Sequence, residues 1–198
     1  MPRLEEAFEQ GIDAGITSVY FEGGEPFLHY PLLLHGLRLA RDSGLRSGIV
    51  TNGYWARSVE DAVMWLAPIA EIGVDDLSVS NDALHASRLE ESPARFAIEA
   101  ARQLGMPVGS ICIGAGPDAR GDHGAVVGGG VLFKGRAADR LTEGLPRHGA
   151  DRFRECPHED LATPGRIHLD PYGNVFVCQG ISIGNAWERP LAQIMAEY

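Results

Sequence analysis

The sequence has 198 residues, of which 44% are hydrophobic, enough for one core with at most a small second domain. Its net charge of −10 and its lack of a basic cluster argue against nucleic acid as a partner, because phosphate binding relies on concentrated lysine and arginine. The sequence shows no apolar run of about 18 residues and no secretory leader, so we expect a cytoplasmic protein without a membrane partner. An odd number of cysteines, three, favours reduced thiols or metal ligands over a disulfide framework.

The first predicted elements are a helix over residues 4–12 and a short strand over residues 19–22, which ends in Gly-Gly-Glu-Pro. Two adjacent glycines remove Cβ, so a ligand can reach the backbone there. Pro26 fixes the exit of the loop, and Glu25 supplies an acceptor for an ammonium group. The alternative is a tight turn that packs a helix against the sheet. The candidate ligand-binding residues of this loop are Gly23, Gly24, Glu25 and Pro26.

The rest of the first 145 residues repeats a strand and helix period of about 30 residues, the size of a βαβ unit. Further strands are predicted at residues 48–51, 76–80, 108–113 and 131–134. Helices are predicted to begin at Pro31 and after the capping residues Ser58 and Ser92, and to end at Gly44, Gly73 and Gly105. This alternation predicts a parallel α/β sheet with helices outside it. The glycine-rich stretch 114–130 is predicted to be a mobile loop.

Ligands of βα proteins bind at the carboxyl ends of the strands, so polar residues there are candidates. Thr51 and Asn52 follow one strand, although Asn-Gly is also a common turn. Ser78, Ser80 and Asp82 surround the end of the next predicted strand, at residues 76–80. The alternative to a ligand site there is that Asp82 caps a turn and the serines only end the strand.

The last 50 residues do not continue this alternation of strands and helices. Residues 166–178 predict a β-hairpin with its turn at residues 170–174. Cys156 precedes the hairpin and Cys178 ends it. The residues alone leave two interpretations open for this segment, a zinc site and buried structural cysteines. The zinc ligands would be Cys156, His158, His168 and Cys178.

The Gly-Gly-Glu-Pro loop, followed one strand later by Thr51-Asn52-Gly53, resembles the radical S-adenosylmethionine (radical SAM) enzymes. The resemblance implies a partial (βα)6 barrel whose first strand is missing. It also implies that residues 23–26 hold the methionine amino group, with support from Thr51 and Asn52. The remaining implied contacts to the cofactor are Ser78, Ser80 and Asp82 at the ribose and Gly135 at the adenine.

The family binds its catalytic 4Fe–4S cluster through a Cys-x3-Cys-x2-Cys loop, whereas the first cysteine here is Cys112. We therefore expect a core over residues 1–145 that is truncated at its amino end and lacks the cluster ligands. Residues 146–198 resemble the start of a SPASM or twitch auxiliary-cluster domain, which implies Cys156 and Cys178 as ligands of an auxiliary iron–sulfur cluster.

The function implied by the resemblance is reductive cleavage of S-adenosylmethionine to a 5′-deoxyadenosyl radical that abstracts hydrogen from a substrate. The implied partners are a peptide or protein substrate and a reductant such as flavodoxin or ferredoxin. Because the cluster cysteines are absent, we expect this chain alone to be inactive. The alternative is a non-catalytic module that binds S-adenosylmethionine or a partner without a cluster.

Overall fold

The computed structural model describes residues 2–81, 92–113, 120–121, 124–129, 139–140, 142–147, 149, 160–178 and 180–198. The chain divides into two compact units. Thr17–Phe133 form the first, and Pro2–Ile16 together with Lys134–Tyr198 form the second. The first helix of the chain is therefore grouped with its carboxyl-terminal segment. The predicted boundary at residue 145 lies in a stretch described only in part and stays a prediction.

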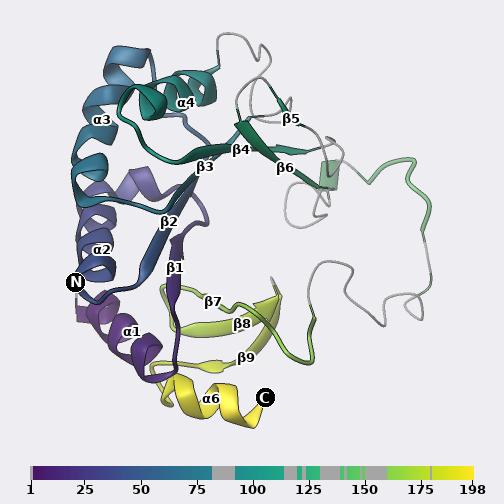
Figure 1. Cartoon of the computed structure of the whole chain (residues 1–198). Helices are drawn as coiled ribbons and strands as arrows, with labels where there is room; N and C mark the ends of the chain where they lie inside the picture. Colours follow the sequence, from purple (N-terminus) through teal and green to yellow (C-terminus); the bar gives the residue numbers. More distant parts are fainter. Residues whose placement is uncertain are drawn as a thin grey trace. The chain divides into compact units, whose positions relative to one another are not determined.

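The first unit is built on a parallel sheet (Figure 1). Its first four strands pair in parallel in chain order: β1 (Ser18–Phe21), β2 (Arg46–Thr51), β3 (Asp76–Ser80) and β4 (Val108–Ile113). Beyond β4, β6 (Gly124–Gly129) pairs in parallel, and β5 (Arg120–Gly121) pairs with β6 in antiparallel orientation. This arrangement confirms the predicted α/β class.

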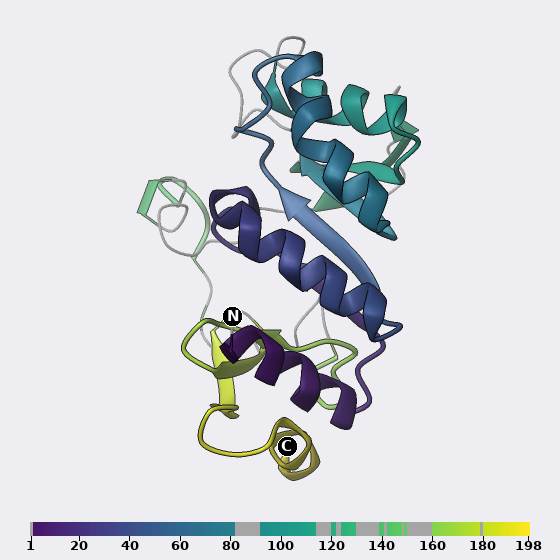
Figure 2. The ribbon, with the colours of Figure 1, turned by 90° about the vertical axis from the view of Figure 1, so that its left-hand side faces the viewer.

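Three α-helices cover one face of this sheet and lie in front of its strands in Figure 2. They are α2 (Tyr30–Asp42), α3 (Val59–Ile72) and α4 (Pro93–Gln103), and a short 3-10 helix, η1 (Pro26–His29), precedes α2. The predicted caps are confirmed, since the hydroxyl of Ser58 accepts from the Asp61 N–H and that of Ser92 from the Arg95 N–H. The glycines predicted to end the helices, Gly44, Gly73 and Gly105, all have positive φ.

The core of the first unit lies between the sheet and these helices. Ile49 on β2 and Leu77 on β3 are fully buried and in register, so they share the helix-covered face. Leu37, Leu66 and Ile98 meet them from the three helices. Alternation along the strands places their neighbours on the opposite face, which we call the open face. Its members on the first three strands include Tyr20, Gly48, Asp76, Ser78 and Ser80.

The prediction of a mobile loop over residues 114–130 is wrong in part, because β5 and β6 lie within this range. Ser110 of β4 is in register with Val126 of β6. This pairing supplies partners for backbone groups that β4 would otherwise expose as an edge strand, which outweighs the low strand propensity of glycine. The strand predicted at 131–134 lies outside the described residues, as do Asp82, Gly135, Cys156 and His158.

The second unit contains an antiparallel sheet in the order β7 (His168–Leu169), β8 (Asn174–Cys178), β9 (Ile181–Asn185), together with the helices α1 (Pro2–Asp13) and α6 (Leu191–Glu197). The turn between β7 and β8 lies at the predicted residues. Asp170 organises it, because its Oδ1 accepts from the N–H groups of Tyr172 and Asn174 at 2.9 Å each. Strand β9 was not predicted.

Two side chains of helix α1 contact the carboxyl-terminal segment: the guanidinium carbon of Arg3 lies 4.7 Å from the ring centroid of Trp187, and Gln10 forms two hydrogen bonds. The amide of Gln10 donates to the carbonyl of Ala186 at 2.8 Å and accepts from the N–H of Leu191 at 2.8 Å. A small core of Val175, Ala186, Leu191 and Ile194 lies in the same unit, with Ala14 packed against it. Across the described part of the chain, no helix is both long and apolar enough to cross a membrane.

Candidate functional site

The loops that follow β1 and β2 are joined by the carboxylate of Glu25. Its Oε1 accepts from the hydroxyl of Thr51 at 2.8 Å and from the N–H of Phe27 at 3.2 Å. Its Oε2 accepts from the N–H of Asn52 at 2.9 Å. Only 6% of Glu25 is exposed, so these bonds compensate the cost of burying the carboxylate. The structure thus brings together Glu25, Thr51 and Asn52, three of the predicted site residues.

Thr51 is the centre of this network. Besides donating to Glu25, its Oγ1 accepts from the N–H of Gly53 at 3.1 Å and from the indole N–H of Trp55 at 3.0 Å. A hydroxyl offers one donor and two acceptor positions, so all three are used. Thr51 is in register with Val79 of the helix-covered core, which places its side chain on that face.

Four aromatic side chains support the network from the core. The rings of Phe27 and Trp55 are stacked, with centroids 4.1 Å apart and planes 14° apart. Tyr30 and Trp65 meet edge to face, with centroids 4.9 Å apart. The Tyr30 hydroxyl donates to the Trp65 carbonyl, and burial raises the pKa of that hydroxyl against the opposing effect of Arg38. Our sequence reasoning missed this cluster, although its signal was visible: Phe27 and Trp55 closely follow the two loop motifs.

The glycines before Glu25 leave the loop open. Gly23 and Gly24 have φ of 78° and 53° and are exposed, and no atom beyond the adjacent residues lies within 4 Å of the position that a Cβ would occupy on either. Their backbone groups are therefore accessible to a ligand, as the sequence predicts for a loop of this composition.

Gly53, in the loop after β2, packs closely on α4. Its φ is 73°, and a Cβ on it would lie 3.0 Å from the Cα of Ala94. Asn52 shapes the same turn, since its Oδ1 accepts from the N–H of Tyr54 at 3.0 Å. Both loops are thus fixed by contacts inside the first unit.

The predicted residues on β3 lie on the open face instead. The hydroxyl of Ser78 donates to Oδ2 of Asp76 at 2.8 Å, and Ser80 is half-buried. These serines are therefore separated by the sheet from the Glu25 and Thr51 side chains. Asn81, which sequence reasoning did not single out, follows β3, and its N–H donates to the carbonyl of Ile111 at 2.9 Å.

The described residues do not form a metal site. Among them no group of three or more histidine, cysteine, aspartate or glutamate side chains could hold a metal ion. Cys178 is a half-buried free thiol at the end of β8, and His168 lies on the neighbouring strand, in register with Phe176. Because Cys156 and His158 lie outside the described residues, the auxiliary cluster and the zinc alternative both stay predictions.

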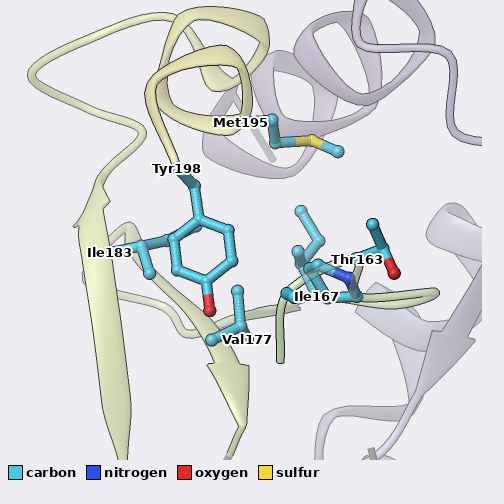
Figure 3. Close-up of a pocket in the computed structure, with 8 residues that line it drawn as sticks. Thr163, Ile167, Val177, Ile183, Met195 and Tyr198 are labelled. Carbon is cyan, nitrogen blue, oxygen red and sulfur yellow. The ribbon is translucent and has the colours of Figure 1, made fainter. Parts of the chain in front are cut away.

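The second unit contains a cavity of about 300 Å³ (Figure 3). It is lined by Ala162, Thr163, Pro164, Ile167, Val177, Ile183, Met195 and Tyr198. The Tyr198 hydroxyl donates to the carbonyl of Leu161 and that of Thr163 to Asp160, so both hydroxyl hydrogens are already engaged within the protein. The surface offered by this cavity is therefore mainly apolar.

No model of a known protein family matches the chain, and no curated protein was found to match it. The geometry of the two loops is therefore the basis for a functional assignment.

Proposed function

We propose that the first unit is the cofactor-binding part of a radical SAM enzyme core and binds S-adenosylmethionine at the carboxyl ends of β1 and β2. One observation carries this proposal: a buried carboxylate, Glu25, joins the two loops directly beside two exposed glycines. The carboxyl edge of a parallel sheet is the usual ligand site in such folds. In this proposal the sheet is part of a partial (βα)6 barrel, and residues 146–198 begin an auxiliary-cluster extension.

The loop offers accessible backbone and one unused acceptor position to the methionine end of the ligand. The backbone of Gly23 and Gly24 is open to an approaching carboxylate or ammonium group. A carboxylate offers about four acceptor positions, and Glu25 uses three of them within the protein. We assign the remaining position, on Oε2, to the ligand ammonium group, while Pro26 and Thr51 keep the loop in place.

The other predicted contacts complete the proposal. Ser80 would hold the ribose hydroxyls from the open face as donor and acceptor, and Ser78, whose hydrogen is donated to Asp76, would contribute there as an acceptor. Asp82 and Gly135 keep their predicted roles at the ribose and the adenine.

The chain's own residues do not fit a catalytic 4Fe–4S cluster. Its three cysteines are far apart in sequence, and the described residues contain no cluster of metal-binding side chains. We therefore derive no chemical step through a cluster. Reductive cleavage of S-adenosylmethionine, the flavodoxin or ferredoxin reductant and the peptide or protein substrate stay predictions from the resemblance.

The same shortage of cysteines favours the second candidate, a non-catalytic module that binds S-adenosylmethionine or a partner without a cluster. Anaerobic reconstitution with iron and sulfide separates the two. We expect the 198-residue chain to remain colourless and to release no 5′-deoxyadenosine. A brown protein that releases 5′-deoxyadenosine would show that the chain itself is an enzyme.

Binding of S-adenosylmethionine tests the shared part of both candidates. We expect saturable binding by isothermal titration calorimetry, and a loss of at least about tenfold in affinity in Gly24→Ala, because the new Cβ obstructs the backbone. Gly44→Ala is the matched control, since Gly44 also has positive φ and open space around its Cβ position but ends α2. Equal affinities of the two variants would contradict the proposed site.

A further inference from the structure

An aromatic ring lies across the open face of the sheet. Tyr20, Gly48 and Asp76 are in register on β1, β2 and β3, so they form one row on this face. A Cβ on Gly48 would lie 2.3 Å from Cε1 and 2.7 Å from Cζ of Tyr20. The ring therefore occupies the space that a side chain on β2 would fill, and it extends across β2 in the direction of Asp76. Half of Tyr20 remains exposed.

The carboxylate in this row is held in position. Ser78, two residues along β3 and on the same face, donates to Oδ2 of Asp76 at 2.8 Å. No other bond to Asp76 is found within the described part of the chain, which leaves Oδ1 available. A short strand thus presents a fixed carboxylate beside an exposed aromatic ring.

These two groups favour the same ligand charge. The face of a tyrosine ring attracts a cation, and a carboxylate pairs with one. Arg46 lies on this face one row closer to the amino ends of the strands, and the described residues show no ion pair between it and Asp76. The net charge of −10 adds a general attraction for cationic partners.

We propose that the open face of β1–β3 binds an arginine side chain of a peptide, with its guanidinium on the Tyr20 ring and paired with Asp76. Arginine fits better than lysine, because its planar group stacks on an aromatic ring while its N–H groups reach a carboxylate. Ser78 acts as a positioning residue for the carboxylate. This inference rests on the proposed peptide substrate and specifies the side chain by which that substrate is recognised.

The test uses the full chain and two end-blocked tripeptides, Gly-Arg-Gly and the same peptide with citrulline, the neutral isostere, in place of arginine. Binding is measured at low ionic strength from the changes in the NMR chemical shifts of the amides around Tyr20 and Asp76. We expect the citrulline peptide to bind at least about threefold more weakly, and Asp76→Asn to weaken arginine binding by about the same factor. Tyr20→Leu should weaken it by about threefold, whereas Tyr20→Phe, which keeps the ring, should not.

Glu71→Gln is the matched control for charge, because Glu71 is exposed on α3, which covers the other face. It should bind the arginine peptide as the natural chain does. Equal binding of the arginine and citrulline peptides, or equal effects of Asp76→Asn and Glu71→Gln, would overturn the inference. Calorimetry with S-adenosylmethionine separates the two proposals: cofactor binding without arginine preference refutes only the inference, and arginine preference without cofactor binding refutes only the proposed function.

Discussion

The hydroxyl of Thr51 donates to the carboxylate of Glu25 over 2.8 Å and so joins the loop after β2 to the loop after β1. These residues are 26 positions apart in sequence, and both side chains are buried. Because the Thr51 oxygen also accepts from Trp55 and Gly53, one side chain links the two loops to the aromatic core. The shape of the proposed cofactor site thus depends on buried contacts of Thr51 with Trp55 and Gly53, which lie behind the Glu25 carboxylate that we assign to the ligand.

Thr51→Val should lower the free energy of unfolding by about 2 kcal/mol, because it keeps the shape of the side chain but leaves the buried Trp55 N–H and Glu25 Oε1 without one partner each. Thr51→Ser, which retains the hydroxyl, should lose less than half as much. Urea unfolding followed by tryptophan fluorescence measures both. A loss in Thr51→Ser as large as that in Thr51→Val would contradict a dominant contribution of the hydroxyl.

Gly53→Ala should destabilise the chain more than Gly105→Ala. Both glycines have positive φ, so both variants lose about 1 kcal/mol from backbone strain. Only Gly53 has backbone close to its Cβ position, with the Ala94 Cα at 3.0 Å, and this overlap adds about 1 kcal/mol or more. Thermal unfolding compares the two, and identical melting temperatures would contradict the close contact between this loop and α4.

Gln10→Leu should lower the free energy of unfolding of the second unit. The substitution leaves the N–H of Leu191 and the carbonyl of Ala186 without their Gln10 partner. The expected cost is about 1–3 kcal/mol. Hydrogen exchange at the Leu191 amide is the direct measurement, and it should become faster. Gln103→Ala, at an exposed position on α4, is the control and should leave that rate unchanged.

The stability of the β7–β8 turn should fall in acid. Desolvation, the largest single effect on Asp170, raises its pKa, but hydrogen bonds from Asn174, Tyr172 and Gly173 together hold that pKa below its ordinary value of 3.8. A carboxyl group with a lowered pKa stabilises the folded state fully above the ordinary value. This contribution is lost as the pH falls below 3.8 through the folded-state pKa. The protection factor of the Asn174 amide, which is the exchange rate corrected for its intrinsic pH dependence, measures this contribution as a function of pH, and Asp170→Asn should remove the dependence of that factor on pH.

The elements of the first unit could be predicted where local signals agree with the fold. The strand at 76–80 and the helix capped by Ser58 occur as predicted, because apolar alternation and capping chemistry depend on neighbouring residues. The pairing of β6 with β4 could not be predicted, since a glycine-rich strand is decided by the edge that it joins. The association of α1 with the carboxyl-terminal segment, through Gln10, joins residues 176 positions apart and has no local signal.

The loop residues of the candidate site were also predicted, but their division between the two faces of the sheet was not. Glu25 was expected to offer its carboxylate to a ligand, and the structure shows that protein groups already use three of its acceptor positions. The partners of a buried carboxylate depend on the register of β1 and β2 and on the loop geometry, which the motif alone does not reveal.

The most direct test of S-adenosylmethionine binding is a titration of the isotopically labelled chain followed by the amide signals of Gly23, Gly24 and Asn52. We expect these three signals to shift with one common dissociation constant, while those of Gly44 and Gly105, which end distant helices, stay fixed. Unchanged signals at Gly23, Gly24 and Asn52 at saturating S-adenosylmethionine would contradict the assignment of this edge of the sheet as the cofactor site.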